Sequence, residues 1–289
     1  MTEAVKKLAV LGYPIRHSLS PVIHGEWIRQ YGVNATYNAI EVAPEALEHF
    51  MRHTMFEENY AGVNLTIPHK EAAMKFVDSL EGVPVHPSHI GAINTLWMHD
   101  EKLVGLNTDA WGFEKNLSSK CDLKHTAKKS LVLGAGGAAK AVCFALDPYC
   151  DELIITNRTR ARAEALAAHI KTASSKEKNA HVTVIDWSEI EVHLKDITLL
   201  VNTTSLGMKG QPPLEISLDN LPRNALVTDI VYNPLITPLL GQAKARGNAI
   251  VDGLGMLLYQ AANAFHIWFP EIMPEVTDEL RERVLQELR

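Results

Sequence analysis

The sequence has few cysteines, no long apolar run and no block of basic residues. Its three cysteines, Cys121, Cys143 and Cys150, form no Cys-x-x-Cys pair. This argues against a disulfide framework or a zinc site, and it predicts a reducing, cytoplasmic environment. No stretch reaches the ~18 apolar residues of a membrane helix, and the N-terminus lacks a signal-peptide cleavage pattern. We therefore expect neither a metal nor a membrane partner.

The charge balance argues against nucleic acid as a partner. The 289 residues include 28 Lys and Arg and 34 Asp and Glu, which gives a formal net charge of −6 at pH 7. A nucleic-acid-binding face needs clustered basic residues, and no such cluster is evident. Hydrophobic residues make up 46% and charged residues 21%, as in ordinary globular proteins. The length predicts two domains.

Residues 130–162 have the pattern strand, glycine turn, helix, strand. The apolar run 131–133 precedes the turn Gly134-Ala135-Gly136-Gly137-Ala138-Ala139, and an alanine-rich segment leads to a second apolar run, 153–155. In such a unit the glycines allow a tight turn and let backbone N–H groups approach a pyrophosphate. The helix N-terminus favours the phosphate charge. A turn without a ligand is the alternative, but the flanking elements favour a dinucleotide site.

The second strand of this unit is not followed by the acidic residue of an NAD site. The sequence there is Asn157-Arg158-Thr159-Arg160-Ala161-Arg162. Guanidinium groups pair bidentately with a ribose 2′-phosphate, which a carboxylate would repel. Three solvated arginines are the alternative, although cations are disfavoured at the start of a helix. The pattern therefore predicts NADP (NADPH) rather than NAD.

Strands and helices alternate before this unit. Ser20 is expected to cap a helix that begins at Pro21, and a later helix is expected over 69–80. The hydroxyls of Ser18 and Ser20, beside a helix N-terminus, suit a carboxylate ligand. Further along the chain, the polar segment 171–179 is expected to be an exposed loop.

Lys70 directly follows a predicted strand and lies in the first turn of the next helix. A cation is disfavoured there, and ligands bind at the carboxyl ends of strands in open α/β sheets. We therefore prefer a role in a ligand site to a solvated lysine. Asp109 follows a predicted hairpin, and it either caps the next helix or pairs with Lys70. The spacing leaves both roles open.

Taken in order, these motifs resemble those of the shikimate dehydrogenase family, from Gly12 to Gln260. Gly12-Tyr13-Pro14 through His24 is similar to the family's substrate-carboxylate motif, and residues 64–70, NLTIPHK, to its Asn-x-Thr-x-Pro-x-Lys motif. One departure is Gly25, where the family often has Asn. The resemblance implies Lys70 and Asp109 as the catalytic residues. It implies substrate contacts by Ser18, Ser20, Thr66, Lys70, Asn94, Asp109, Tyr232 and Gln260. It implies cofactor contacts by Gly134, Ala135, Gly136, Gly137, Ala138, Asn157, Arg158, Thr159, Arg160, Ala161, Arg162, Ile230 and Gly253.

The resemblance also implies the architecture and the activity. We expect an α/β fold with an N-terminal substrate domain over 1–110 and a Rossmann-type NADP-binding domain over 111–253. The C-terminal helices, 254–289, would pack back on the substrate domain. The expected activity is NADP-dependent reduction of 3-dehydroshikimate to shikimate, an oxidoreductase step of aromatic amino-acid (chorismate) biosynthesis. We expect a cytoplasmic monomer or homodimer with a small-molecule substrate.

Two other functions stay open. A quinate/shikimate dehydrogenase would have a similar fold with a broader choice of substrate or cofactor, although Arg158 and Arg162 argue against NAD. A non-catalytic NADP-binding sensor is the second alternative. Lys70, Asp109 and Gln260 argue against it, because a sensor needs no proton donor.

Overall fold

The computed structural model describes residues 4–82, 87–173 and 180–288, and the chain separates into two compact units. Unit 1 comprises Met1–Trp111 and Leu258–Arg289, and unit 2 comprises Gly112–Leu257. Of the loop expected over 171–179, residues 171–173 instead continue a helix, and 174–179 lie outside the described residues. No helix in the described part of the chain is long and apolar enough to cross a membrane.

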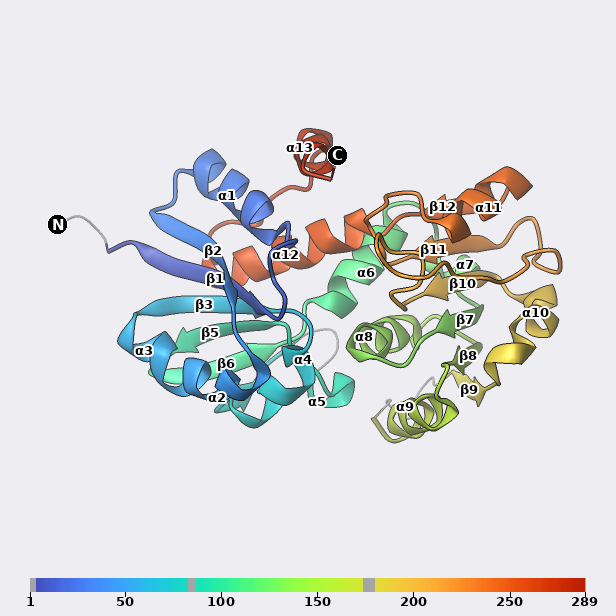
Figure 1. Cartoon of the computed structure of the whole chain (residues 1–289), viewed down its shortest axis with the longest axis horizontal. Coiled ribbons are helices and arrows are strands. Elements are labelled where there is room, and N and C mark those ends of the chain that lie inside the picture. Colours follow the sequence, from blue (N-terminus) through green and yellow to red (C-terminus); the bar gives the residue numbers. More distant parts are fainter. Residues whose placement is uncertain (1–3, 83–86, 174–179, 289) are drawn as a thin grey trace. The chain divides into compact units, whose positions relative to one another are not determined.

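Unit 1 is built on a mixed, six-stranded sheet in the order β2-β1-β3-β5-β6-β4 (Figure 1). Its strands are β1 (Lys6–Gly12), β2 (Ala35–Glu41), β3 (Tyr60–Leu65), β4 (Ser79–Leu80), β5 (Thr95–His99) and β6 (Lys102–Leu106). β3 runs parallel to β1, whereas β5 runs antiparallel to both β3 and β6. The ends of β1, β3 and β6 and the beginning of β5 therefore lie at one edge of the sheet.

Helices cover both faces of this sheet. The helices of unit 1 are α1 (Ser20–Tyr31), η1 (Pro44–Ala46), α2 (Leu47–His49), η2 (Phe50–Thr54), α3 (Met55–Glu57), α4 (His69–Ala72), η3 (Ala73–Lys75), α5 (Pro87–Ile90), α12 (Leu254–Trp268), which begins in unit 2, and α13 (Asp278–Gln286), which contacts α1. On one face Leu47, Met51 and Met55 pack against Ala9 and Leu11. On the other face the indole of Trp268 donates a 3.1 Å hydrogen bond to the Leu96 carbonyl, which anchors α12 to β5.

Two local expectations in unit 1 are wrong. The helix expected over 69–80 ends at Lys75, because the backbone of Asp78 turns to pair with Leu103 and residues 79–80 form a strand beside β6. Ser20 is not a helix cap but the first residue of α1. The chain is already helical at Leu19, whose carbonyl accepts from the N–H groups of Val22 and Ile23. The Ser20 hydroxyl is thus not needed for capping.

Unit 2 is a fully parallel sheet in the order β12-β11-β10-β7-β8-β9. Its strands are β7 (Lys129–Leu133), β8 (Glu152–Thr156), β9 (His181–Val184), β10 (Leu199–Asn202), β11 (Leu226–Asp229) and β12 (Ala249–Val251). Its helices are α7 (Leu123–Thr126), α8 (Gly137–Leu146), α9 (Arg160–Ala173), η4 (Trp187–Glu189), α10 (Ile190–His193), η5 (Leu194–Asp196) and α11 (Pro238–Arg246); α6 (Asp109–Ser118) begins in unit 1 and continues into unit 2.

The buried residues of unit 2 hold helices against both faces of its sheet. Ile190 and Leu194 pack with Leu239 and Leu240 of α11 against one face of the sheet, while α8 and α9 lie on the other (Figure 1). From β7 the strand order continues to β8 on one side and to β10 on the other. Such a reversal is where open α/β sheets bind ligands, at the carboxyl ends of the strands.

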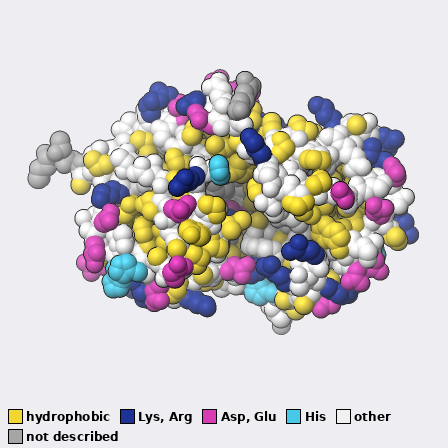
Figure 2. All heavy atoms as spheres, viewed as in Figure 1, with side chains coloured by type: hydrophobic (Ala, Val, Ile, Leu, Met, Phe, Trp, Pro, Cys, Tyr) yellow, Lys and Arg dark blue, Asp and Glu magenta, His cyan; other side chains and the backbone are white. Residues whose placement is uncertain are grey.

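Figure 2 shows basic and acidic side chains interspersed over the visible face of each unit.

Candidate active site

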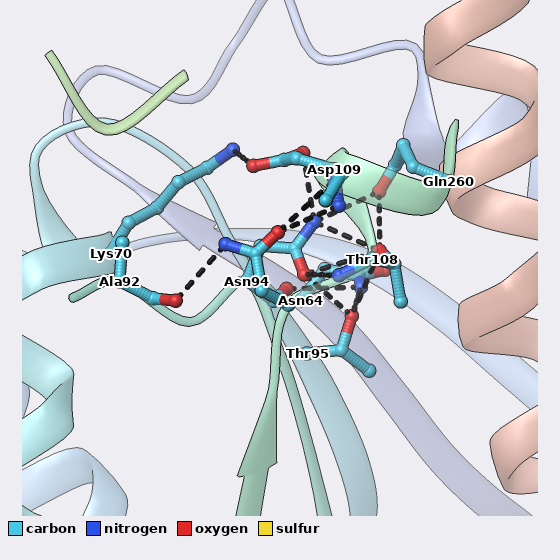
Figure 3. Close-up of polar contacts among 10 residues, drawn as sticks. Asn64, Lys70, Ala92, Asn94, Thr95, Thr108, Asp109 and Gln260 are labelled. Carbon is cyan, nitrogen blue, oxygen red and sulfur yellow. Dashed lines mark hydrogen bonds and ion pairs between the residues drawn. The ribbon is translucent and has the colours of Figure 1, made fainter. Parts of the chain in front are cut away.

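Lys70 and Asp109 meet at the sheet edge of unit 1 where β1, β3 and β6 end (Figure 3). The Lys70 Nζ atom lies 2.5 Å from Asp109 Oδ2, and their side chains are 20% and 6% exposed. The two residues are far apart in the sequence and follow different strands, β3 and β6. Their pairing resolves the two roles that the sequence left open for Asp109.

A different residue holds the start of α6. The side-chain oxygen of Asn107 accepts hydrogen bonds from the backbone N–H groups of Asp109 at 2.9 Å and Ala110 at 3.4 Å. The Asn107 amide donates in turn to the Ala92 carbonyl at 3.0 Å. Since Asn107 takes up these helix N–H groups, both oxygens of Asp109 are left for other side chains.

Asn94 holds the second oxygen of Asp109. Its Nδ2 lies 2.9 Å from Asp109 Oδ1 and 3.3 Å from Gln260 Oε1. Thr108, which is fully buried, also contacts Gln260 through its hydroxyl, at 3.3 Å. The structure thus joins four residues that the sequence assigned to the site, Lys70, Asp109, Asn94 and Gln260, in one hydrogen-bonded group.

The predicted carboxylate ligands, Ser18 and Ser20, follow β1 in unit 1, and Thr66 lies on the neighbouring loop after β3. The N–H of Thr66 donates to the Leu11 carbonyl at 2.9 Å, so the loops after β1 and β3 run side by side. Ser18 is half-buried, and its Oγ accepts from the N–H of Ser20 at 3.4 Å. A Cβ on Gly12 would come within 2.5 Å of the Thr66 side chain, which explains the glycine there.

Beneath these side chains lies a buried layer to which the sequence had assigned no role. The Tyr37 hydroxyl donates to Asn64 Oδ1 at 2.6 Å, and Asn64 Nδ2 donates to Thr95 Oγ1 at 3.0 Å. The His24 ring stacks on the Tyr37 ring, with 4.1 Å between the two ring centroids. Burial lowers the pKa of His24 to about 3. Strand-end position was a signal for Asn64 and Thr95, but Tyr37 lies in the middle of β2 and gave none.

In unit 2 the glycine turn lies at the reversal of strand order. Gly134 has a φ of +116°, which favours glycine, and a Cβ there would lie 2.5 Å from Thr203 Oγ1. At Gly136, the residue before α8, a Cβ would meet no atom within 4 Å. The first N–H groups of a helix have no acceptor within it, so this open space suits a pyrophosphate. Gly134, Ala135, Gly136, Gly137 and Ala138 therefore fit the role that the sequence gave them.

The arginines after β8 fall into two kinds. Arg160 pairs with Glu164 and Asp186, each at 2.8 Å. Arg158 and Arg162 are exposed and form no ion pair with any residue that the structure describes. The Asn157 amide folds back onto the Thr159 carbonyl at 3.0 Å. Two uncompensated guanidinium groups at this strand end fit a dianionic phosphate, whereas the charge of Arg160 is already balanced.

The other unit 2 residues lie at the ends of β11 and β12. Asp229 is fully buried and accepts from Asn202, the Val231 N–H and Thr237. These bonds shape the loop that carries Ile230 and Tyr232. A Cβ on Gly253 would lie 2.3 Å from the Ile230 carbonyl oxygen, so Gly253 has a packing role. Tyr232 belongs to unit 2, whereas the group around Lys70 belongs to unit 1.

Comparisons with known proteins show which family the chain belongs to. Family models for the shikimate dehydrogenase substrate binding domain, shikimate / quinate 5-dehydrogenase and the shikimate 5′-dehydrogenase C-terminal domain match residues 10–96, 116–207 and 253–285. The shikimate dehydrogenase (NADP(+)) of Paramagnetospirillum magneticum is 46% identical over 99% of this chain and 100% of its own length.

Solved structures agree as well. Shikimate 5-dehydrogenase from Thermus thermophilus, crystallised with NADP(H) and shikimate, has a TM-score of 0.82 and 34% identity over 98% of this chain and 100% of that chain. Quinate dehydrogenase from Corynebacterium glutamicum, in complex with NAD, has a TM-score of 0.86 and 28% identity over 98% of this chain and 99% of that chain. The expected family and α/β fold are confirmed: the chain belongs to the shikimate dehydrogenase family.

Proposed function

We propose that this chain catalyses the reversible, NADP-dependent reduction of 3-dehydroshikimate to shikimate in aromatic amino-acid biosynthesis, in the cytoplasm. The observation that carries the proposal is the Lys70–Asp109 ion pair, which is bonded through Asn94 to Gln260. One ammonium and one carboxylate among neutral polar side chains suit a polyhydroxylated substrate that gains and loses a proton. A sensor without catalysis would need no such pair.

Lys70 supplies the proton chemistry. When a carbonyl is reduced, negative charge develops on its oxygen and must be stabilised. Lys70 Nζ donates a hydrogen bond to the substrate C3 oxygen and then delivers a proton to it. Asp109 Oδ2 holds Nζ in place, and Asn94 holds Asp109 Oδ1. In the oxidation of shikimate the proton returns from the C3 hydroxyl to Lys70 Nζ.

The remaining unit 1 residues bind the substrate. Ser18 and Ser20 bind the carboxylate, which the reaction leaves unchanged, and Thr66 contacts the ring from the neighbouring loop. Asn94 and Gln260 contact the hydroxyl groups, and Tyr232 of unit 2 completes the set. On this proposal residues 1–110 and 254–289 form the substrate domain, and residues 111–253 form the cofactor domain.

Unit 2 holds the cofactor. Residues 134–138 bind the pyrophosphate, and Ile230 and Gly253 lie near the nicotinamide. The segment 157–162 lies at the 2′-phosphate, which Arg158 and Arg162 bind, while Arg160 is held by Glu164 and Asp186. The bound NADPH supplies the hydride. Arg158 and Arg162, which are exposed and have no ion-pair partner among the residues that the structure describes, support NADP over NAD.

A broader quinate/shikimate dehydrogenase is the second candidate, favoured by the similarity to a quinate dehydrogenase that binds NAD. The test is an absorbance assay at the reduced nicotinamide band, in which purified protein receives shikimate or quinate with NADP+ or NAD+. We expect turnover with shikimate and NADP+ to exceed every other pair. Equal turnover with quinate would favour the broader enzyme, and turnover with neither acid would reject both candidates.

A further inference from the structure

A chain of buried hydrogen bonds leads from Tyr37 to Asp109, and each residue of the chain donates to the next. Figure 3 shows the part of this chain from Asn64 to Asp109. The series of bonds runs from Tyr37 to Asn64 at 2.6 Å, from Asn64 to Thr95 at 3.0 Å, from Thr95 to the Asn94 side-chain oxygen at 3.1 Å and from the Asn94 amide to Asp109 at 2.9 Å. We call these five residues the relay. None of them is more than 7% exposed.

Two backbone groups fix the direction of the relay. The Asn94 carbonyl oxygen, which can only accept, faces Asn64 Nδ2 at 3.2 Å. The Thr108 N–H, which can only donate, faces Asn94 Oδ1 at 2.7 Å. Both amide groups therefore have one orientation. Because Asn64 uses its two N–H groups on Asn94 and Thr95, the Thr95 hydroxyl accepts from Asn64 and donates its proton to Asn94.

The direction matters at the Asp109 end. With Oδ1 held by Thr95 and Thr108, Asn94 turns its NH2 group toward the carboxylate of Asp109. A flipped Asn94 amide would place its oxygen against that carboxylate and repel it. Hydrogen bonds in such a low-dielectric chain also polarise one another. The relay thus sets where Asp109 Oδ1 lies, and hence where Oδ2 holds Lys70 Nζ.

We propose that Thr95 is a positioning residue for proton transfer: together with the Thr108 N–H, its hydroxyl holds the Asn94 amide so that Asp109 keeps Lys70 in the reactive position. Thr95 is fully buried, and it acts through Asn94 rather than on the substrate. The proposal rests on the function proposed above for Lys70. It extends the site by a second layer, from Thr95 through Asn64 to Tyr37 in β2.

The test removes the hydroxyl while keeping the shape. Thr95→Val should lower kcat for shikimate oxidation by about tenfold or more, because a displacement of ~1 Å at a reacting group can cost ~10²-fold. The KM for NADP+ should not change, since the cofactor residues lie in unit 2. Thr95→Ser, which keeps the hydroxyl, should restore most of kcat. A role in folding alone would lower the melting temperature without this pattern.

Thr198→Val is the matched control. At the amino-terminal end of β10, the Thr198 hydroxyl also accepts one hydrogen bond, from the Lys129 N–H, and donates another, to the Lys129 carbonyl. The Thr198→Val variant should lose stability, as Thr95→Val does, but its kcat should equal that of the wild type. Tyr37→Phe provides a second test of the relay, with Tyr149→Phe as its control, because Tyr149 donates a 2.7 Å bond to Glu114 in unit 2. Only Tyr37→Phe should lower kcat.

The outcomes separate this proposal from the function beneath it. Wild-type protein that is inactive with shikimate would reject the proposed function and with it the relay. Active wild-type protein with an unchanged kcat in Thr95→Val would reject the relay alone. If Thr95→Val does not fold, Tyr37→Phe decides, and a kcat equal to that of Tyr149→Phe would overturn the proposal.

Discussion

Replacing Arg158 and Arg162 with alanine should reverse the preference of this chain for NADP. Both guanidinium groups are exposed and unpaired among the described residues at the strand end where the 2′-phosphate is expected. A hydrogen bond to a charged group contributes about 1.5–3 kcal/mol. The loss of one such bond for each arginine should therefore weaken NADP+ binding by roughly 10- to 100-fold per substitution. NAD+, which lacks the phosphate, should bind almost as before.

The measurement is the ratio of the dissociation constants of NADP+ and NAD+, obtained by calorimetric titration of each variant. Arg160→Ala is the matched control, because Arg160 is already paired with Glu164 and Asp186. It should change the ratio much less than either of the other substitutions. If the ratio of the double variant equals that of the wild type, the 2′-phosphate binds elsewhere and the assignment is wrong.

Three further predictions concern the carboxylate, the buried histidine and the glycine turn. Ser20→Ala should raise KM for shikimate about tenfold and leave kcat unchanged, since the lost contact is the same in ground and transition states; an unchanged KM would place the carboxylate elsewhere. Burial lowers the pKa of His24 from 6.5 unfolded to about 3 folded, so the unfolded chain binds this proton first as pH falls. The free energy of unfolding should thus drop by about 2 kcal/mol between pH 7 and pH 5 through His24 alone, and His24→Phe should flatten this dependence in urea titrations. An equal slope in that variant would contradict the burial argument. Gly134→Ala should weaken NADP+ binding and lower the melting temperature, because its Cβ would lie 2.5 Å from Thr203 Oγ1; wild-type values would contradict this.

The sequence predicted those parts of the site that depend on local pattern. The glycine turn, the arginines after β8 and the position of Lys70 after a strand follow from spacing and from helix electrostatics. The Lys70–Asp109 contact depends on the antiparallel pairing that brings the end of β6 beside the end of β3 through β5, and spacing does not carry that information.

The errors have the same origin. The helix expected over 69–80 ends at Lys75 because residues 79–80 pair with β6, and that pairing depends on a strand that is distant in the sequence. The relay was missed as a connected set because Tyr37 looks like an ordinary strand residue, and because the position of Thr95 at a strand end does not show which groups it bonds. Their importance comes from the donors and acceptors that surround them after folding, which only the assembled sheet reveals.

The central claim is that Lys70 transfers the proton to and from the substrate. The value of kcat for shikimate oxidation with NADP+ tests this claim most directly. Lys70→Ala should lower kcat by ~10²–10⁴-fold, the usual contribution of general acid–base catalysis, while NADP+ affinity stays unchanged. Removal of Lys70 also leaves Asp109 without its cation, so circular dichroism must show that the variant is folded. Lys75→Ala, at an exposed position on the next turn, is the matched control and should behave as the wild type. A folded Lys70→Ala enzyme with most of the wild-type kcat would contradict the mechanism.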